Sequence, residues 1–290
     1  MNETSFAAPV PGGEIVGSWW HRDAPGLPVL GLHGITANHR SFAGPGAALD
    51  QPLLAIDQRG RSGSRNLPGP YALIDLADDA ARVLDSAGLE RVVVAGHSMG
   101  AFVATRLAER HPDRVHALVL IDGGLPLRPP PVDVPPEALL GPALERLSMT
   151  FESRAAYREF WRQHPALGPY WNDIIEDYLD ADLHAIDGEL RAGALPEAVG
   201  INLVEFDGRD GYAAALEEQE RQGLRRLLLR SPRGLFDETP GLYDDEWLAD
   251  WTGRLPGLQV RDVADTNHYT ILLGSGLPAV VDAVHAVSRP

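Results

Sequence analysis

The residues of this chain that could most directly do chemistry lie at 96–100, where the sequence reads Gly-His-Ser-Met-Gly. The apolar run 91–95 before this segment indicates a β-strand, and the apolar spacing of 101–107 after it indicates a helix. In that setting the two glycines let the strand and helix backbones approach, while the serine side chain is exposed at a tight turn. The context predicts a nucleophilic serine, Ser98. The alternative is an ordinary tight turn in a chain with 30 glycines.

A serine hydroxyl becomes a good nucleophile only when an imidazole takes its proton and a third group orients that imidazole. His268 is the best placed of the ten histidines, because it follows a strand-like run at 258–262 and precedes the last predicted helix. His97 adjoins the serine, but we expect it to point away from Ser98 if the turn is tight. An ordinary surface histidine at 268 is the alternative to a catalytic base.

Two backbone amides are expected to stabilise the negative charge that develops on an attacked carbonyl oxygen. The N–H of Met99 opens the predicted helix, where the free amides and the helix dipole favour an anion. The N–H of Ile35 follows the predicted strand 28–33 and a glycine, which makes it the second candidate donor. A plain turn at the end of the strand is the alternative interpretation of this segment.

The group that orients the imidazole should be an acid, and the residues leave two candidates. Asp122 ends the predicted strand 117–121, so it should emerge at the same edge of the sheet as Ser98. Asp237 lies in a longer loop after the apolar run 227–229. We favour Asp122, although an aspartate at a strand end can also simply cap the next turn.

Short apolar runs alternate with helix-like segments along most of the chain. We expect strands at 15–20, 28–33, 52–57, 92–95, 117–121, 227–229 and 258–260, and helices at 74–87, 100–110 and 278–287. Near-continuous apolar strands separated by helices are typical of a mostly parallel sheet. The sequence therefore predicts an α/β fold with a doubly wound sheet and helices on both of its faces.

This alternation stops after residue 122. A proline-rich stretch at 125–136 cannot form a central strand, and residues from 137 to about 223 are helical in pattern and rich in aromatic side chains. We interpret 123–223 as a helical cap inserted into a core formed by 1–122 and 224–290. Open α/β sheets bind ligands at the carboxyl ends of their strands, so the cap should cover the site.

The aromatic side chains of this cap predict an apolar substrate, although most of them should pack against each other. The residues that we expect to contact substrate are Trp161 and Trp171 of the cap and His33 at the end of a predicted strand.

Composition excludes several functions. The formal net charge of −16 argues against nucleic acid and membrane surfaces as partners, because both reward clustered cations. All 25 basic residues are arginine, which removes Schiff-base chemistry and Ser–Lys dyads, and the absence of cysteine removes disulfides and thiolate metal sites. We expect neither a cofactor nor a metal.

The first residues have neither the basic region nor the apolar core expected of a signal peptide, and no apolar stretch reaches the roughly 18 residues of a membrane span. We therefore expect a cytoplasmic protein that acts on a small molecule as a monomer or homodimer.

These motifs and their order resemble those of the α/β-hydrolase superfamily. Leu-His-Gly at 32–34 resembles the family's oxyanion turn, and 57–64 resembles its D-x-R-G-x-G-x-S loop with the second glycine displaced by one. Residues 96–100 match the nucleophile elbow, and Asn-His at 267–268 matches the histidine loop, where glycine is commoner than asparagine. The family usually carries its acid just after the strand corresponding to 227–229, where this chain has none; some members keep it at the place of Asp122.

The resemblance implies a capped serine hydrolase of the esterase or lactonase type, which forms an acyl-enzyme on Ser98. Carbon–carbon bond hydrolases and cofactor-free perhydrolases of the family use the same residues. Some relatives that keep the serine and the histidine are small-molecule receptors. The sequence leaves these functions open as alternatives.

Overall fold

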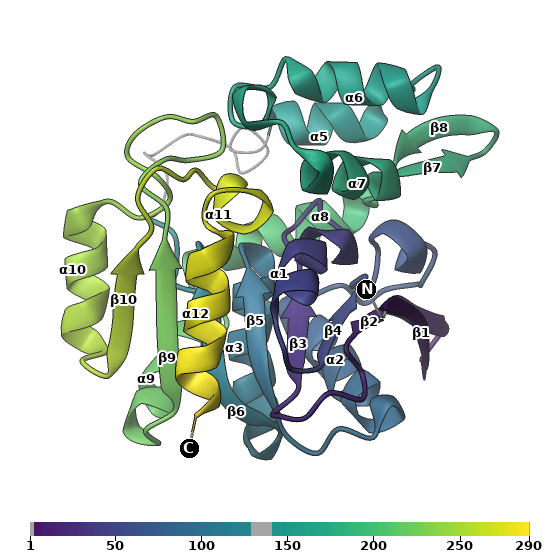
Figure 1. The fold of residues 1–290 in the computed structure, drawn as a ribbon. Coiled ribbons are helices and arrows are strands. Elements are labelled where there is room, and N and C mark those ends of the chain that lie inside the picture. Colours follow the sequence, from purple (N-terminus) through teal and green to yellow (C-terminus); the bar gives the residue numbers. More distant parts are fainter. Residues whose placement is uncertain (1–2, 129–140, 290) are drawn as a thin grey trace.

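An eight-stranded sheet forms the centre of the protein (Figure 1). The computed structural model describes residues 3–128 and 141–289, so most of the predicted proline-rich stretch lies outside the described residues. The strand order is β1-β2-β4-β3-β5-β6-β9-β10, parallel from β4 to β10, with β2 antiparallel to both β1 and β4. The strands are β1 (Glu3–Val10), β2 (Gly13–Trp20), β3 (Val29–Leu32), β4 (Leu53–Ile56), β5 (Val92–His97), β6 (Val115–Ile121), β9 (Arg225–Arg230) and β10 (Leu258–Asp262).

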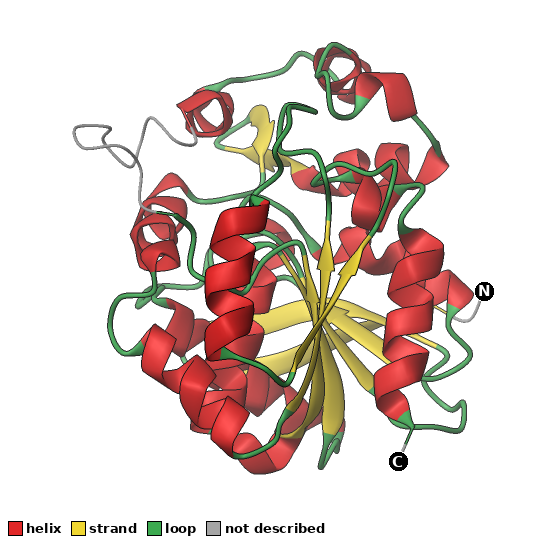
Figure 2. Ribbon diagram, turned by 90° about the vertical axis from the view of Figure 1, so that its left-hand side faces the viewer, coloured by secondary structure: helices red, strands yellow, loops and turns green. Residues whose placement is uncertain are grey.

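Helices cover both faces of the twisted sheet (Figure 2). Alternate residues of a strand point to opposite faces, so Val92 and Val94 join one apolar core while Val93 and Ala95 join the other. The first core includes α2 (Leu73–Ala87), α3 (Met99–Arg110), α9 (Tyr212–Arg221) and α10 (Asp245–Arg254); the second includes α12 (Leu277–Ser288), which packs on α1 (Ala43–Ala48). Burial on both faces explains the unbroken apolar runs of the strands and confirms the predicted fold class. None of the helices in 3–128 and 141–289 is long and apolar enough to cross a membrane.

A cap of short helices lies beyond the carboxyl ends of the parallel strands (Figure 1). Its own apolar cluster includes Tyr157, Trp161, Ile175 and Leu179, and Leu273 of the core helix α11 (Thr270–Leu273) packs into the same cluster. The cap elements are α5 (Gly141–Ser148), α6 (Arg154–Arg162), α7 (Asp173–Asp182), β7 (Leu183–Ile186), β8 (Glu189–Ala192) and α8 (Pro196–Leu203).

The predicted cap over 123–223 includes α9, but in the structure this helix packs on the core. The rings of Phe102 and Tyr212 lie 5.3 Å apart, and Gln219 Nε2 donates a 2.8 Å hydrogen bond to the carbonyl of Thr105 in α3. The apolar side of α9 therefore completes the helical layer over the sheet. Helical periodicity predicts that a helix has an apolar face but does not specify which neighbour covers that face. The predicted cap, which ends at 223, therefore wrongly includes α9.

Two elements were not expected from the sequence, the strand β1 and the hairpin β7–β8. The hairpin turns at Asp187 and Gly188, which have φ angles of 52° and 85°. An Asp-Gly pair between two short strands is a strong hairpin signal, because both residues tolerate positive φ. That signal was present in the sequence of the predicted helical cap.

We expect Gly100→Ala to lower the free energy of unfolding by about 3 kcal/mol or more, because it overpacks a rigid contact. A Cβ at Gly100 would lie 1.9 Å from the carbonyl oxygen of Leu32 in β3. Gly200→Ala is the matched control, since a Cβ there meets nothing within 4 Å and alanine favours the helix by roughly 0.5–1 kcal/mol. Urea unfolding measures the free energy of unfolding of both variants. Equal changes in the two variants would contradict the close approach of β3 and α3.

Candidate active site

Ser98 occupies the turn between β5 and α3, at the carboxyl edge of the sheet. Its φ of 53° and ψ of −121° lie outside the regions that most residues adopt, and such strain is typical of functional turns. Glycine is required around it: a Cβ at Gly96 would lie 2.3 Å from the carbonyl oxygen of Gly100, and one at Gly123 would lie 2.7 Å from Ser98 Cα. The three chain segments therefore hold the serine in one fixed place.

His268 and Asp122 form a buried pair beside this turn. The imidazole Nδ1 lies 2.7 Å from Asp122 Oδ2, and Asp122 Oδ1 accepts a 3.0 Å hydrogen bond from the amide of Ser231. A carboxylate only accepts, so Nδ1 carries the proton and Nε2 is left to accept one. Ser98 and His268 line the same cavity. Within residues 3–128 and 141–289 no hydrogen bond joins them, so proton transfer would require the hydroxyl to approach the ring, as is common in free enzymes.

Asp237, the alternative acid, lies against other partners. Its carboxylate accepts hydrogen bonds from Tyr170 Oη at 3.0 Å and from Asn267 Nδ2 at 2.8 Å, and it pairs with Arg233 at 3.1 Å. It therefore connects the residue before His268 to the cap. The structure brings Asp122, and not Asp237, to the imidazole.

Ile35 and Met99, the two predicted amide donors, lie in chain segments next to Ser98. A Cβ at Gly34 would lie only 3.3 Å from Ser98 Cβ, so the turn that carries the Ile35 amide passes close to the serine side chain. Met99 is the first residue of α3. In the described part of the chain neither N–H donates to another backbone or side-chain group. Two free amides beside a nucleophile are what an oxyanion requires.

His97 lies in the wall of the cavity that Ser98 lines, contrary to the expectation that it points away. Its Nε2 donates a 2.8 Å hydrogen bond to the backbone carbonyl of His268, and the two rings lie 4.8 Å apart. Burial, with a smaller contribution from His268, lowers the pKa of His97 to about 3. The side chain is therefore neutral near pH 7 and holds the histidine loop without adding charge.

The three side chains predicted to contact substrate, His33, Trp161 and Trp171, do not line the cavity. His33 is fully buried; its Nδ1 donates to the carbonyl of Gly34 at 2.8 Å, and its Nε2 accepts from the amide of Gln58 at 3.0 Å. Trp161 packs in the cap's own aromatic cluster, and Trp171 lies partly buried beside it. The prediction of these contacts is wrong: Trp161 packs against other cap rings, Trp171 lies against Arg162 and donates to Glu176, and His33 is bound to backbone groups.

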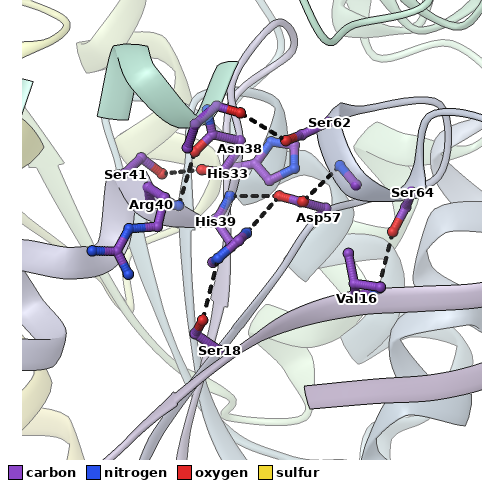
Figure 3. A network of polar contacts seen from close by, with 12 residues as sticks. Val16, Ser18, His33, Asn38, His39, Arg40, Ser41, Asp57, Ser62 and Ser64 are labelled. Carbon is purple, nitrogen blue, oxygen red and sulfur yellow. Dashed lines mark hydrogen bonds and ion pairs between the residues drawn. The ribbon is translucent and has the colours of Figure 1, made fainter. Parts of the chain in front are cut away.

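Asp57 begins the loop 57–64 and is the centre of a polar network (Figure 3). Its Oδ1 accepts hydrogen bonds from the backbone N–H and from Nδ1 of His39, both at 2.8 Å, and its Oδ2 accepts from the amide of Gly63 at 2.9 Å. Burial alone would raise the pKa of this carboxyl, but the hydrogen bonds from His39, together with the charge interactions with His39 and His33, lower it overall. The loop supplies no side chain to the cavity, so its role in this structure is to brace its neighbours.

A cavity of 470 Å³ lies over the serine, between the sheet edge and the cap. Its walls are mainly apolar: Ile35, Phe102, Leu127, Leu203, Val204, Phe206, Leu235, Leu242, Leu272 and Leu273, with the rings of Tyr178 and Tyr269. Apart from Ile35, the sequence pattern did not single out these residues. Phe102, one helical turn after Ser98, and Tyr269, next to His268, could have been found from their positions alone.

No group of three histidine, aspartate or glutamate side chains in the described ranges could hold a metal ion.

The comparison with protein families agrees with this geometry. The family model described as alpha/beta hydrolase fold matches residues 28–174, half of the chain. The chain belongs to the α/β-hydrolase-fold family. The matched residues of this α/β hydrolase include the turn of Ile35, the loop of Asp57, the turn of Ser98 and Asp122, so they cover the segments that surround the candidate serine.

Curated relatives match this α/β hydrolase over short segments. A putative carbamate hydrolase RutD of Caulobacter segnis is 40% identical over 74 residues, which are 25% of this chain and 28% of the relative. A putative non-heme haloperoxidase of Mycobacterium phage D29 is 34% identical over 102 residues, which are 33% of this chain and 36% of the relative. The matched segments thus span about a third of the length of these relatives.

Solved structures match the whole fold at low identity. The E-2-(acetamidomethylene)succinate hydrolase has a TM-score of 0.81 at 21% identity and covers 99% of this chain and 100% of its own. A thioesterase domain from the curacin biosynthetic pathway has a TM-score of 0.77 at 18% identity, with the same coverage. At these identities the likeness shows the α/β-hydrolase fold alone.

We expect Asp122→Asn to slow covalent labelling of Ser98 by a fluorophosphonate by about 10⁴-fold, because an amide cannot stabilise the imidazolium or hold its tautomer. Asp237→Asn keeps an acceptor on Asn267 and should change the rate by less than about tenfold. Labelling rates of both variants, with thermal unfolding to verify the fold, measure the difference. The reverse ranking would move the acid to Asp237.

We expect the free energy of unfolding to fall as the pH is lowered from 6.5 towards 4. Burial lowers the pKa of His33 from 6.5 to about 4, so in this window the unfolded chain binds a proton that the native state does not. Stability therefore rises with pH through the window, by up to about 3 kcal/mol for this residue. Urea unfolding at pH 7 and pH 5 measures the loss. A His33→Gln variant should lose less, and an equal loss would exclude His33 as its source.

Proposed function

We propose that this α/β hydrolase is a carboxylic-ester hydrolase that cleaves an ester or lactone of an apolar small molecule. One observation carries the proposal: Ser98 and the buried His268–Asp122 pair meet at a single cavity with apolar walls. A strained serine beside an oriented imidazole is the arrangement that makes a hydroxyl nucleophilic.

In the proposed reaction Ser98 Oγ attacks the substrate carbonyl carbon while His268 Nε2 accepts the hydroxyl proton. Asp122 holds the imidazole through Nδ1 and stabilises the positive charge that forms on it. The amides of Ile35 and Met99 donate to the carbonyl oxygen as it becomes negative. The imidazolium then protonates the leaving alcohol, and a water molecule activated by the same imidazole releases the acid from Ser98.

The cavity supports a small, neutral substrate. A volume of 470 Å³ suits a small organic molecule, and its leucine and phenylalanine walls favour an apolar acyl or alcohol group. Three charged side chains also line it, Arg128, Asp207 and Arg209. Arg209 pairs with Asp207 at 2.6 Å and Arg128 with Asp244 at 3.0 Å. The lining residues that the structure describes thus offer no uncompensated cation to a carboxylate substrate.

The name of one relative widens the choice of bond to be tested. RutD is named as a putative carbamate hydrolase, so a carbamate is the first alternative to an ester. Carbon–carbon cleavage, perhydrolysis and a receptor function use the same site residues. The two reactions are distinguished by which substrate is turned over, and a receptor by binding without turnover. The cytoplasmic location and the monomeric or dimeric state stay predictions of the sequence.

We expect Ser98→Ala to lower hydrolysis of a panel of aryl esters and lactones by about 10⁴-fold or more, because the nucleophile is lost. The panel should contain acyl groups of graded size and one carbamate. Ser41→Ala is the matched control: Ser41 also lines the cavity, but its hydroxyl donates to the carbonyl of Asn38 at 2.8 Å. That variant should keep activity within about threefold of the wild type.

The results of this panel separate the candidate functions. Serine-dependent turnover of apolar esters supports the proposal and ranks the acyl groups. Serine-dependent turnover of the carbamate alone would replace the ester by a carbamate. Binding of the panel compounds without turnover by the wild type would contradict the ester hydrolase and favour a receptor.

A further inference from the structure

Arg61 is a fully buried cation whose guanidinium donates only to uncharged acceptors in the part of the chain that the structure describes. Its Nε donates to the carbonyl of Ile35 at 3.1 Å and its Nη1 to the carbonyl of Arg59 at 2.9 Å. Its Nη2 donates to Asn202 Oδ1 at 2.6 Å and lies 3.4 Å from Met99 Sδ. Burial lowers the pKa of Arg61 to about 9, which still leaves it charged at pH 7.

The position of Arg61 is not explained by stability. Burying a charge with no hydrogen-bonded counter-charge costs several kcal/mol, and an apolar side chain of similar length would avoid that cost. The carboxylate of Glu205, which is bonded to Asn202 and not to Arg61, offsets only part of it. Arg59, two residues earlier, shows the usual solution: it is also buried, but its guanidinium binds Asp79 through two hydrogen bonds of 2.6 Å and 3.0 Å. Arg61 has no such partner and instead joins three separate segments.

We propose that Arg61 is a positioning residue that links the cap to the two amides of the oxyanion site. The inference rests on the function proposed above. Two of the residues that Arg61 touches, Ile35 and Met99, are those whose amides would bind the oxyanion. A third, Asn202, belongs to the cap helix α8. One planar side chain thus contacts both walls of the oxyanion site and the cap.

The cap end of this link is rigid. Asn202 is fully buried, and its Nδ2 donates to the carbonyl of Tyr71 at 2.6 Å and to Glu205 at 3.1 Å. These bonds fix the amide so that Oδ1 faces Arg61. A guanidinium has donors in several directions of one plane and can hold these acceptors together, whereas a lysine ammonium cannot.

The loop end of the link is equally tight. Gly60 accepts a 2.8 Å hydrogen bond from the amide of Leu195, and a Cβ at Gly60 would lie 2.7 Å from Ala198 Cβ. The start of α8 and the loop 57–64 therefore move together. A displaced cap helix would displace Arg61, and with it the turn of Ile35.

This coupling should be visible in catalysis, because oxyanion donors act on the transition state more than on bound substrate. Arg61→Met removes the hydrogen bonds and the charge at nearly constant length. We expect kcat for Ser98-dependent ester hydrolysis to fall about 30-fold or more, with KM within about threefold. Hydrogen exchange at the amides of Ile35 and Met99 should become faster. Asn202→Ala should change both readouts in the same direction but less.

Arg226→Met is the matched control. Arg226 is equally buried, but it lies on β9, donates to the carbonyl of Leu216 at 2.9 Å, pairs with Glu220 and does not line the cavity. Its substitution should lower the melting temperature while kcat and the exchange at Ile35 and Met99 stay near wild-type values. The double variant Arg61→Met with Asn202→Ala should lose little more kcat than Arg61→Met alone, since both break one link.

A folded Arg61→Met protein with wild-type kcat and unchanged exchange at the two amides would overturn the proposal. Additive losses in the double variant would overturn the link to the cap. If Arg61→Met does not fold, the proposal is tested with Asn202→Ala, by measuring kcat and hydrogen exchange at Ile35 and Met99 in the same way. If the wild type hydrolyses no substrate and Ser98 resists the fluorophosphonate, the proposed function fails; the exchange rates still decide whether Arg61 positions the amides.

Discussion

The close approach of backbone segments around Ser98 is the constraint on which the rest of the site depends. A Cβ at Gly100 would lie 1.9 Å from a carbonyl oxygen of β3, and one at Gly123 would lie 2.4 Å from the carbonyl oxygen of Ser98. Only glycine allows β3, β5 and β6 to end against the start of α3. The parallel register then brings the Ile35 turn, the serine and Asp122 to one edge of the sheet. The positive φ values of Ser98 (53°) and Asp122 (44°) persist because the strands on both sides hold them.

Burial also determines where positive charge can form in this site. It lowers the pKa of His33 to about 4 and that of His97 to about 3, and neither ring contacts a carboxylate within the described residues. His268 differs, because its Nδ1 holds Asp122 at 2.7 Å. Of these three imidazoles, His268 alone is thus placed against a carboxylate. The other two rings act as uncharged braces for the turns that surround Ser98.

The cap has two roles that its composition does not distinguish. Most of its aromatic rings pack against each other, whereas Tyr178, Leu203 and Phe206 form walls of the cavity. Its helix α8 also packs on the loop 57–64, and this loop contacts the turn of Ile35 through Arg61. Under the proposals made above, substrate selection and the geometry of the oxyanion site would be connected through this one loop, and the position of the cap would influence both.

The sequence by itself determined what is local in this protein: the strand-turn-helix of Ser98, the alternation of strands and helices, and the family resemblance. These features depend on residue spacing and on glycine at a few positions, which can be read along one segment. The sequence favoured Asp122 over Asp237 as the partner of His268 but left both open, because both aspartates follow strands; tertiary structure decided which one faces the imidazole. It also decided that α9 covers the core, that Trp161 is buried in the cap, and that the partners of Arg61 are uncharged. Contacts between distant segments depend on how faces pack, and periodicity does not specify the neighbour.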